Sequence, residues 1–216
     1  MASDPDSGTI GAGSIGTIGL TSLIGSKGGR TATFRDSHGH HLTAIRQLIS
    51  SEEIAGKLAE MGRQITIDYE GRDLLMVGVL KGAFMVMADL ARTVDLPVEF
   101  DFMAVSSYGA STQTSGVVRI LKDLDQEIAD RDVLIVEDII DSGLTLNYLL
   151  KSLSVRRPAS LQVATLLLKE GIQRVPLDVK YVGFRIGPEF VIGYGLDYAG
   201  LHRNLPYVGV IEGEPG

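Results

Sequence analysis

The stretch from Val133 to Leu146, VLIVEDIIDSGLTL, restricts the fold more than any other part of the chain. Its first four residues are aliphatic and predict a strand buried on both faces, as in a parallel sheet covered by helices. Two adjacent carboxylates, Glu137 and Asp138, follow at once, and Asp141 begins a short glycine turn. Ligands of such sheets bind beyond the carboxyl ends of the strands. We therefore expect the acidic pair to lie where strand becomes loop, outside the core and facing a ligand.

Strands and helices alternate along the rest of the ordered chain. A helix is predicted before the first buried strand by apolar residues three or four positions apart: Ile54, Leu58, Met61 and Ile65. Ser50 and Glu53 match a capping box at its start. Further strands are predicted at 74–80, 98–105, 117–121, 161–168, 181–186, 190–192 and 207–211, with helices at 83–90 and about 145–156. This alternation predicts an α/β fold with a mostly parallel, twisted sheet flanked by helices.

The N-terminal part of the chain has a different composition. Residues 1–43 are rich in Gly, Ser and Thr, show no helical or strand periodicity, and are interpreted as a flexible extension. Ordered structure is expected from 44 to 212, followed by a short tail at 213–216.

Two patterns in the extension resemble binding motifs. A GxGxxG match is formed by Gly11, Gly13 and Gly16, but the strand and helix that a dinucleotide loop needs are not predicted around it. A histidine cluster, formed by His38, His40 and His41, is more typical of a solvated tail than of a metal site. We expect the function to lie outside the extension.

Composition excludes several classes of protein. The 216 residues include no Cys, which rules out disulfides and thiolate chemistry and fits a reducing compartment such as the cytoplasm. No apolar run reaches the ~18 residues that a membrane span needs. The formal net charge of −7 argues against a nucleic-acid binder, which usually carries a basic face.

The turn after the acidic pair suits a phosphate. Gly143 lets the backbone approach a ligand closely. The hydroxyls of Ser142 and Thr145 join free N–H groups at the start of the next helix, an arrangement that binds phosphate monoesters. The acidic pair suits ribose hydroxyls or a hydrated magnesium ion. Taken alone, the turn is equally compatible with an ordinary helix cap after a solvated acidic strand end.

Five segments in order resemble a known family. The opening stretch is similar to the phosphoribosyl-pyrophosphate loop of type I phosphoribosyltransferases, and its EDIIDSGLT core resembles the hypoxanthine-guanine branch in its bacterial form. The other matches are VLKGA (79–83), SSYG (106–109), Lys169 after LLL, and FVIGYGLDY (190–198) followed by Arg203. The resemblance covers about 45–211. Leu144 stands where some members carry Lys, which puts little in doubt because backbone donors can hold the phosphate.

The resemblance implies both fold and reaction. The fold would be the type I phosphoribosyltransferase fold with a small hood subdomain. The reaction would be purine salvage: phosphoribosyl moves from 5-phosphoribosyl 1-pyrophosphate to N9 of hypoxanthine or guanine, giving IMP or GMP and pyrophosphate. Mg²⁺ would be the cofactor. The resemblance further implies a homodimer or homotetramer that uses small-molecule substrates and neither nucleic acid nor membrane.

The same resemblance assigns the residues that bind phosphoribosyl pyrophosphate. Residues Asp141, Ser142, Gly143, Leu144 and Thr145 would hold the 5-phosphate. Glu137 and Asp138 would hold the ribose hydroxyls, partly through Mg²⁺. The pyrophosphate would meet Lys81, Gly82 and Arg203, and the peptide before Lys81 can be cis in the family. Ser107 and Tyr108 would belong to a lid that closes over the sugar and excludes water.

Purine recognition is assigned in the same way. Phe190 would stack on the base, with the Val191 backbone at its edge. Lys169 would donate to the 6-oxo group and so disfavour adenine. Asp197 would bind a second Mg²⁺ opposite the first. Asp141 would accept or stabilise a proton near purine N7 and is the catalytic residue.

Several alternatives stay open at this point. An RNA-binding pyrimidine attenuation regulator can share the fold, although its usual basic face conflicts with the acidic charge of this chain. A phosphoacceptor receiver domain also gathers carboxylates and a Lys at strand ends, but its acidic pair follows the first strand. An inactive homologue or a xanthine-preferring enzyme would carry similar motifs.

Overall fold

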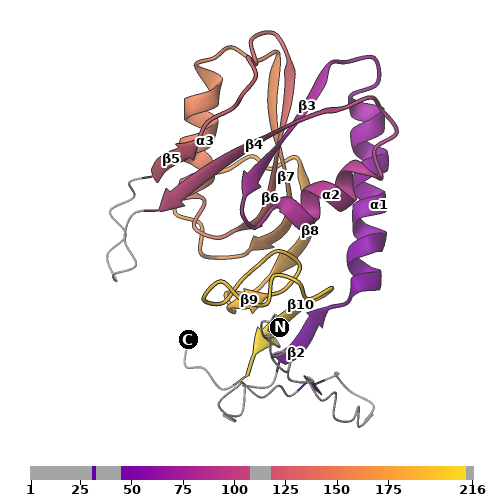
Figure 1. Ribbon diagram of the computed structural model, residues 1–216, viewed down its shortest axis with the longest axis vertical. Helices are drawn as coiled ribbons and strands as arrows, with labels where there is room; N and C mark the ends of the chain where they lie inside the picture. The colour runs from indigo at the N-terminus through magenta and orange to yellow at the C-terminus, as the bar shows by residue number, and fades with distance from the viewer. Residues whose placement is uncertain (1–30, 33–44, 108–117, 213–216) are drawn as a thin grey trace, which may run out of the picture.

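The main sheet has six strands. The computed structural model describes residues 31–32, 45–107 and 118–212. The sheet order is β5-β4-β3-β6-β7-β8, and all neighbours are parallel except β5, which is antiparallel to β4 (Figure 1). The strands are β3 (Leu74–Leu80), β4 (Glu99–Ser107), β5 (Val118–Lys122), β6 (Asp132–Ile140), β7 (Ser160–Lys169) and β8 (Tyr181–Ile186). The prediction of a mostly parallel α/β sheet is confirmed.

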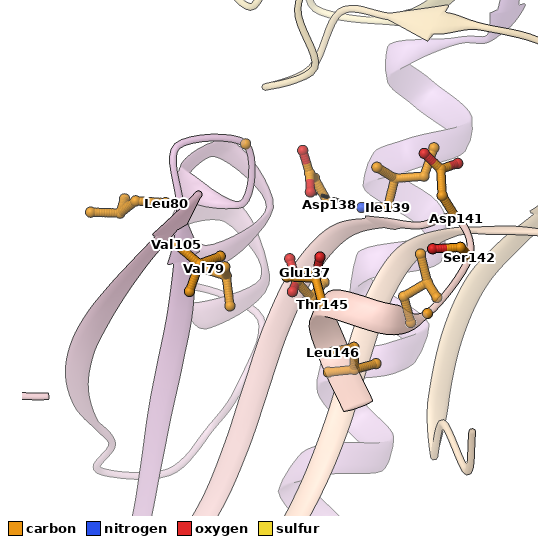
Figure 2. A pocket seen from close by; sticks show the side chains of 13 residues that line it. Val79, Leu80, Val105, Glu137, Asp138, Ile139, Asp141, Ser142, Thr145 and Leu146 are labelled. Carbon is orange, nitrogen blue, oxygen red and sulfur yellow. Dashed lines mark hydrogen bonds between the residues drawn. The ribbon is translucent and has the colours of Figure 1, made fainter. Parts of the chain in front are cut away.

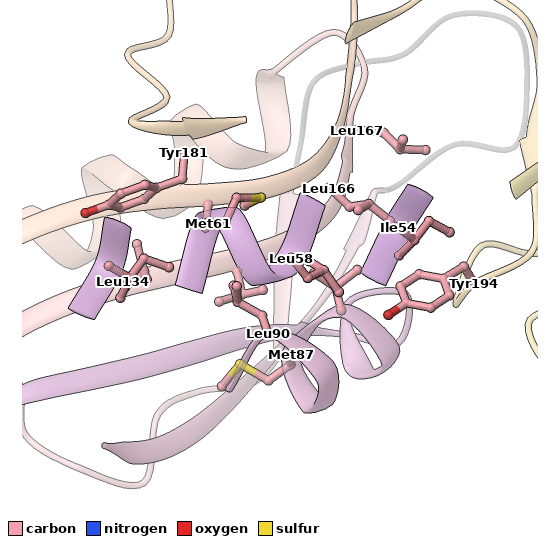
Figure 3. Close-up of a cluster of buried hydrophobic side chains, with 14 of the residues drawn as sticks. Ile54, Leu58, Met61, Met87, Leu90, Leu134, Leu166, Leu167, Tyr181 and Tyr194 are labelled. Atoms are coloured by element: carbon pink, nitrogen blue, oxygen red, sulfur yellow. The ribbon is translucent and has the colours of Figure 1, made fainter. Parts of the chain in front are cut away.

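Helices cover both faces of this sheet because the central strands are apolar on both faces. Leu134 and Val136 of β6 pack into one core cluster together with residues of α1 (Ser51–Asp68) and α2 (Phe84–Ala91) (Figure 3). Val133 and Ile135 point the other way, into a second cluster with α3 (Leu144–Ser154). The alternation of side chains along a strand accounts for this division.

Helix α1 forms as its sequence predicts. The Ser50 hydroxyl accepts a hydrogen bond from the Glu53 backbone N–H at 3.1 Å, and the Ser50 N–H donates to the Glu53 carboxylate at 2.8 Å. This capping box satisfies N–H groups that the first helical turn leaves without partners. The buried face contains the four apolar residues predicted for it: Ile54, Leu58, Met61 and Ile65.

A second, smaller sheet joins the two ends of the chain. It is antiparallel, with the order β1-β2-β10-β9, and lies below the main sheet in Figure 1. Its strands are β1 (Thr31–Ala32), β2 (Ile45–Ile49), β9 (Val191–Ile192) and β10 (Val208–Ile211). This sheet corresponds to the small hood subdomain that the family resemblance implies.

Some expected boundaries were wrong. Strand β1 lies within the extension, where we expected no strand; it exists because β2 offers a free edge for pairing. The glycines Gly11, Gly13 and Gly16 and the histidines His38, His40 and His41 lie outside the described residues, as does the tail at 213–216. Across the described part of the chain, no helix combines the length and apolar character required to span a bilayer.

The most important correction concerns the acidic pair. Glu137 and Asp138 do not follow the strand but lie within it, because β6 continues to Ile140. Pairing with β3 ends at Gly78 and Val136, whereas pairing with β7 continues to Ile140 and Leu168. The acidic pair therefore occupies a strand segment whose β3 side is open.

We predict that Ser50→Ala lowers the free energy of unfolding by about 1 kcal/mol, since it removes the acceptor of the capping box. Ser51→Ala is the matched control: its hydroxyl contacts only the exposed Glu52 carboxylate, and the change should stay within about 0.5 kcal/mol. Urea denaturation of both variants measures the difference. Equal losses would show that the cap does not stabilise α1.

Candidate active site

A cavity of about 220 Å³ opens between β3 and β6 at their carboxyl ends. The strand order reverses direction here, because β3 leads to β4 on one side and β6 leads to β7 on the other. Such a switch point is where α/β sheets bind ligands. The cavity is lined by strand ends and the turn that follows β6: Val79, Leu80, Gly82, Val105, Glu137, Asp138, Ile139, Ile140, Asp141, Ser142, Gly143, Thr145 and Leu146 (Figure 2).

The two carboxylates of the acidic pair line this cavity, with Glu137 buried and Asp138 half-buried. Glu137 is only 7% exposed, and Figure 2 shows the two side chains leaving the strand in different directions. Burial raises the pKa of Glu137 well above its ordinary value, and the neighbouring Asp138 raises it further. Burial also raises the pKa of Asp138 to about 6, although the Ile139 N–H donates to its carboxylate at 2.9 Å. Neither forms a salt bridge with any residue in the described ranges.

Gly82 lies directly against this pair. A Cβ atom added at Gly82 would come within 1.6 Å of the Asp138 carboxylate, so no larger residue fits there. The preceding peptide, Leu80–Lys81, is cis, as the family resemblance implies, and Lys81 is exposed. The turn after β3 thus presents its backbone to the end of β6.

The glycine turn leads straight into α3. Gly143 is the N-cap, and its φ of 78° is a left-handed conformation that favours glycine. No side chain caps the helix, although the Ser142 hydroxyl lies 3.5 Å from the Leu144 nitrogen. The N–H groups of the first turn of α3 are therefore available to an anion. Helix α3 starts at Leu144, one residue before the predicted position.

The back of the turn is supported by the β7–β8 connection. The Arg174 N–H donates to the Ser142 carbonyl at 2.9 Å. An added Cβ at Gly143 would lie 2.4 Å from the Leu177 side chain, which shows how closely the connection approaches. Thr145 contributes to the cavity wall.

The structure pairs two of the residues expected to bind the purine. Lys169 ends β7 and is 7% exposed, and its ammonium lies 2.8 Å from the carboxylate of Asp141. Because β7 neighbours β6, the register of the sheet brings these residues together although they are far apart in sequence.

Arg203 and Asp197 form a second pair. The Arg203 guanidinium lies 2.5 Å from one oxygen of Asp197 and donates to the Gly195 carbonyl at 2.5 Å. The other Asp197 oxygen accepts the Gly200 N–H at 2.7 Å. The Asp197 carboxylate therefore binds both the Gly200 N–H of its own turn and the Arg203 guanidinium. A cation bound here would share the carboxylate with these two donors.

The aromatic residue expected to stack on the base is available to a ligand. Phe190 is 55% exposed, whereas Val191 beside it is buried in β9. Tyr198 meets the Phe190 ring edge-on, with 5.9 Å between centroids and 78° between planes. No role was predicted for Tyr198 from the sequence. The feature that could have indicated this contact is the second aromatic residue at the end of the FVIGYGLDY motif.

The lid residues are only partly described. Ser107 is the last residue of β4, and Tyr108 lies outside the described residues. The lid hypothesis stays a prediction.

The donor set suits Mg²⁺. The acidic pair supplies two hard oxygen ligand groups that form no salt bridge within the described ranges, and proteins usually hold Mg²⁺ by one or two carboxylates together with substrate oxygens and water. The same ranges contain no group of three His, Cys, Asp or Glu side chains that could hold a metal ion.

Comparison with known proteins gives the family. The model of the phosphoribosyl transferase domain matches residues 45–199. The chain belongs to this phosphoribosyltransferase family. It is 54% identical over 171 residues to the hypoxanthine-guanine phosphoribosyltransferase of Mycobacterium avium, covering 76% of this chain and 84% of the relative. It is 50% identical over 165 residues to that of Bacillus subtilis, covering 76% and 92%.

A solved structure of this phosphoribosyltransferase family has the same fold. The crystal structure of a hypoxanthine phosphoribosyltransferase from Staphylococcus aureus superposes with a TM-score of 0.75 at 45% identity, covering 77% of this chain and 90% of that one. The fold and family expected from the motifs are thereby confirmed.

We predict that Asp138→Asn stabilises the unliganded protein at pH 8 by about 2 to 3 kcal/mol, since each pKa unit corresponds to about 1.4 kcal/mol. The folded-state pKa of about 6 exceeds the ordinary 3.8, so the folded state binds the extra proton between these values. The contribution of Asp138 to the free energy of unfolding of the parent protein therefore falls as the pH rises from 3.8 to about 6, and stays low above that pH.

Urea denaturation of both proteins at a series of pH values measures this difference. The gain should be absent near pH 4, grow up to about pH 6 and then level off. Asp95→Asn, at an exposed position after α2, is the control. A loss of stability in Asp138→Asn at pH 8 would contradict the account of a buried, unpaired carboxylate.

Proposed function

We propose that this protein is a hypoxanthine-guanine phosphoribosyltransferase of purine salvage. It transfers phosphoribosyl from 5-phosphoribosyl 1-pyrophosphate to N9 of hypoxanthine or guanine and releases pyrophosphate. The observation that carries the proposal is that one cavity is lined by both the acidic pair and the glycine turn. Relatives about 50% identical over most of the chain support it.

The sugar phosphate binds along the rim of this cavity. The 5-phosphate accepts hydrogen bonds from backbone N–H groups at the start of α3 and from the hydroxyls of Ser142 and Thr145. The ribose hydroxyls meet Glu137 and Asp138, which line the cavity and form no salt bridge with other residues that the structure describes. Leu144 contributes its backbone and no charge to this phosphate site.

Positive charge is required on the pyrophosphate side. Lys81, the Gly82 backbone and Arg203 meet the leaving group. The acidic pair and Asp197 would hold Mg²⁺, which would supply positive charge to offset the negative charge of the pyrophosphate. The exposed Lys81 and the Arg203–Asp197 pair support this arrangement.

The Lys169–Asp141 pair matches one edge of a 6-oxopurine. O6 and N7 lie side by side on that edge, as the ammonium and carboxylate do in the structure. Lys169 donates to O6, while Asp141 accepts or stabilises the proton near N7. The amino group of adenine would point hydrogens at the ammonium. Phe190 stacks on the base, and the backbone of Val191 forms hydrogen bonds with the edge of the base.

Bond cleavage leaves positive character on the sugar carbon, as it does in glycoside hydrolysis. Water must therefore be kept out until the purine nitrogen attacks. We assign this task to the segment that begins at Ser107 and Tyr108. We further propose a cytoplasmic homodimer or homotetramer, as the family resemblance implies.

We predict that nucleotide formation with Mg²⁺ and phosphoribosyl pyrophosphate is fast with hypoxanthine or guanine and at least about a hundredfold slower with adenine, since a site built to donate to an oxygen rejects a donor there. Product is followed by chromatography, and xanthine is included to rank the 6-oxopurines. Adenine turnover above that of hypoxanthine would overturn the role of Lys169.

We predict that Asp141→Asn lowers kcat by roughly a hundredfold or more, as expected for loss of a general base. The KM for phosphoribosyl pyrophosphate should change far less, because Asn keeps the side-chain shape beside the phosphate turn. Initial-rate kinetics, with the exposed Asp95→Asn as control, measure both values. Near-normal kcat would remove the proton-handling role.

A further inference from the structure

A partly buried hydrogen bond connects the segment between β9 and β10 to helix α2. The Tyr194 hydroxyl donates to the Asp89 carboxylate of α2 at 2.6 Å, and the other Asp89 oxygen is held by Arg92 at 2.8 Å. Tyr194 is 6% exposed, and its ring lies in the same core cluster as Ile54 and Leu58 of α1 (Figure 3). Tyr194 thus anchors the segment between β9 and β10 to helices of the main domain.

Both ends of this hydrogen bond belong to elements that carry pyrophosphate-binding residues. Helix α2 directly follows the Lys81–Gly82 turn, and the 193–203 segment carries Asp197 and Arg203. The two touch through their backbones, since an added Cβ at Gly195 would lie 2.2 Å from the Gly82 carbonyl oxygen. A shift of the 193–203 segment would therefore change the distance between Arg203 and Lys81.

Tyr194 has a backbone conformation that residues other than glycine rarely adopt. Tyr194 has a φ of 49°, and its neighbours Gly193 and Gly195 have φ values of 90° and 98°. The two glycines adopt this conformation readily, but at a non-glycine residue such as Tyr194 it persists only where the surroundings fix it. The Tyr194 N–H donates to the Leu205 carbonyl, and the flanking Gly193 and Gly195 also form backbone bonds; the hydroxyl bond to Asp89 adds the side-chain anchor.

We propose that Tyr194 is a positioning residue for the pyrophosphate side of the site. Its hydrogen bond to Asp89 holds the 193–203 segment against the Lys81–Gly82 turn, so that Arg203 and Lys81 face the same leaving group. The kinetic part of this inference rests on the proposed function. Val191 and Ile192 are held by their own pairing with β10, so purine binding should depend less on this bond, with the Phe190–Tyr198 ring contact as the link between the two parts.

The test is Tyr194→Phe, which keeps the ring and removes the hydroxyl. We expect the KM for phosphoribosyl pyrophosphate to rise about tenfold, the size of effect that loss of one buried hydrogen bond produces. The KM for hypoxanthine should stay within about twofold. A rise in both KM values by the same factor, or in neither, would overturn the proposal.

Tyr181→Phe is a matched control for stability. The Tyr181 hydroxyl donates to Asp68 at 2.7 Å, and Tyr181 is 4% exposed, but this bond joins β8 to α1 and does not line the cavity. Both variants lose a partly buried tyrosine–aspartate hydrogen bond, so both should lose similar thermal stability. Only Tyr194→Phe should change the KM for phosphoribosyl pyrophosphate; the same change in Tyr181→Phe would reduce Tyr194 to a structural role.

Variants of Asp89 test the partner. Asp89→Asn keeps an acceptor oxygen, so its KM for phosphoribosyl pyrophosphate should stay near that of the parent protein. Asp89→Ala removes the acceptor and should raise this KM as much as Tyr194→Phe does. The double variant Tyr194→Phe with Asp89→Ala should be no worse than either single variant, because both remove one interaction. Fully additive effects on KM would contradict a direct coupling.

Amide hydrogen exchange gives a measurement that needs no substrate. Exchange across 193–203 should speed up in Tyr194→Phe and stay unchanged in Tyr181→Phe. Unchanged exchange in Tyr194→Phe contradicts the proposal whatever the activity. Failure of the parent protein to form any nucleotide would instead refute the proposed function, and the exchange data would still decide the role of Tyr194.

Discussion

The structure depends on the point at which β6 loses one neighbour and keeps the other. Pairing with β3 ends at Val136, but pairing with β7 continues to Ile140. The strand stays ordered through Glu137 and Asp138 while its β3 side opens into the cavity. Ladder pairing on one side fixes the acidic pair in space more rigidly than a loop would, and that rigidity suits a binding site.

The position of the acidic pair destabilises the protein when no ligand is bound. Glu137 is buried and Asp138 half-buried, neither forms a salt bridge within the described residues, and desolvation raises both pKa values. Such groups are tolerated where a ligand supplies the missing charge and hydrogen bonds. Under the proposed function, the hydroxyls of a sugar and a hydrated cation would do so, which would account for the acidic residues at the end of this apolar strand. Elsewhere in the site, Lys169 neutralises Asp141 and Arg203 neutralises Asp197.

The sequence was most informative where a pattern is local. Apolar runs located β3 and β8 to the residue, and the spacing of Ile54 to Ile65 identified the buried face of α1. The extent of β6 was missed because polar residues continue a strand only when a neighbour pairs with them, which a single segment does not reveal. The Lys169–Asp141 pair and the Tyr194–Asp89 bond each join segments far apart in the sequence, so no local pattern encodes them.

The central claim is that the acidic pair and the glycine turn surround one sugar phosphate. A crystal structure with inosine monophosphate tests it most directly. The account predicts the phosphate at the backbone nitrogens of residues 142–145, with the ribose hydroxyls facing Glu137 and Asp138. A nucleotide phosphate bound anywhere else, with the acidic pair still without a ligand, would contradict it.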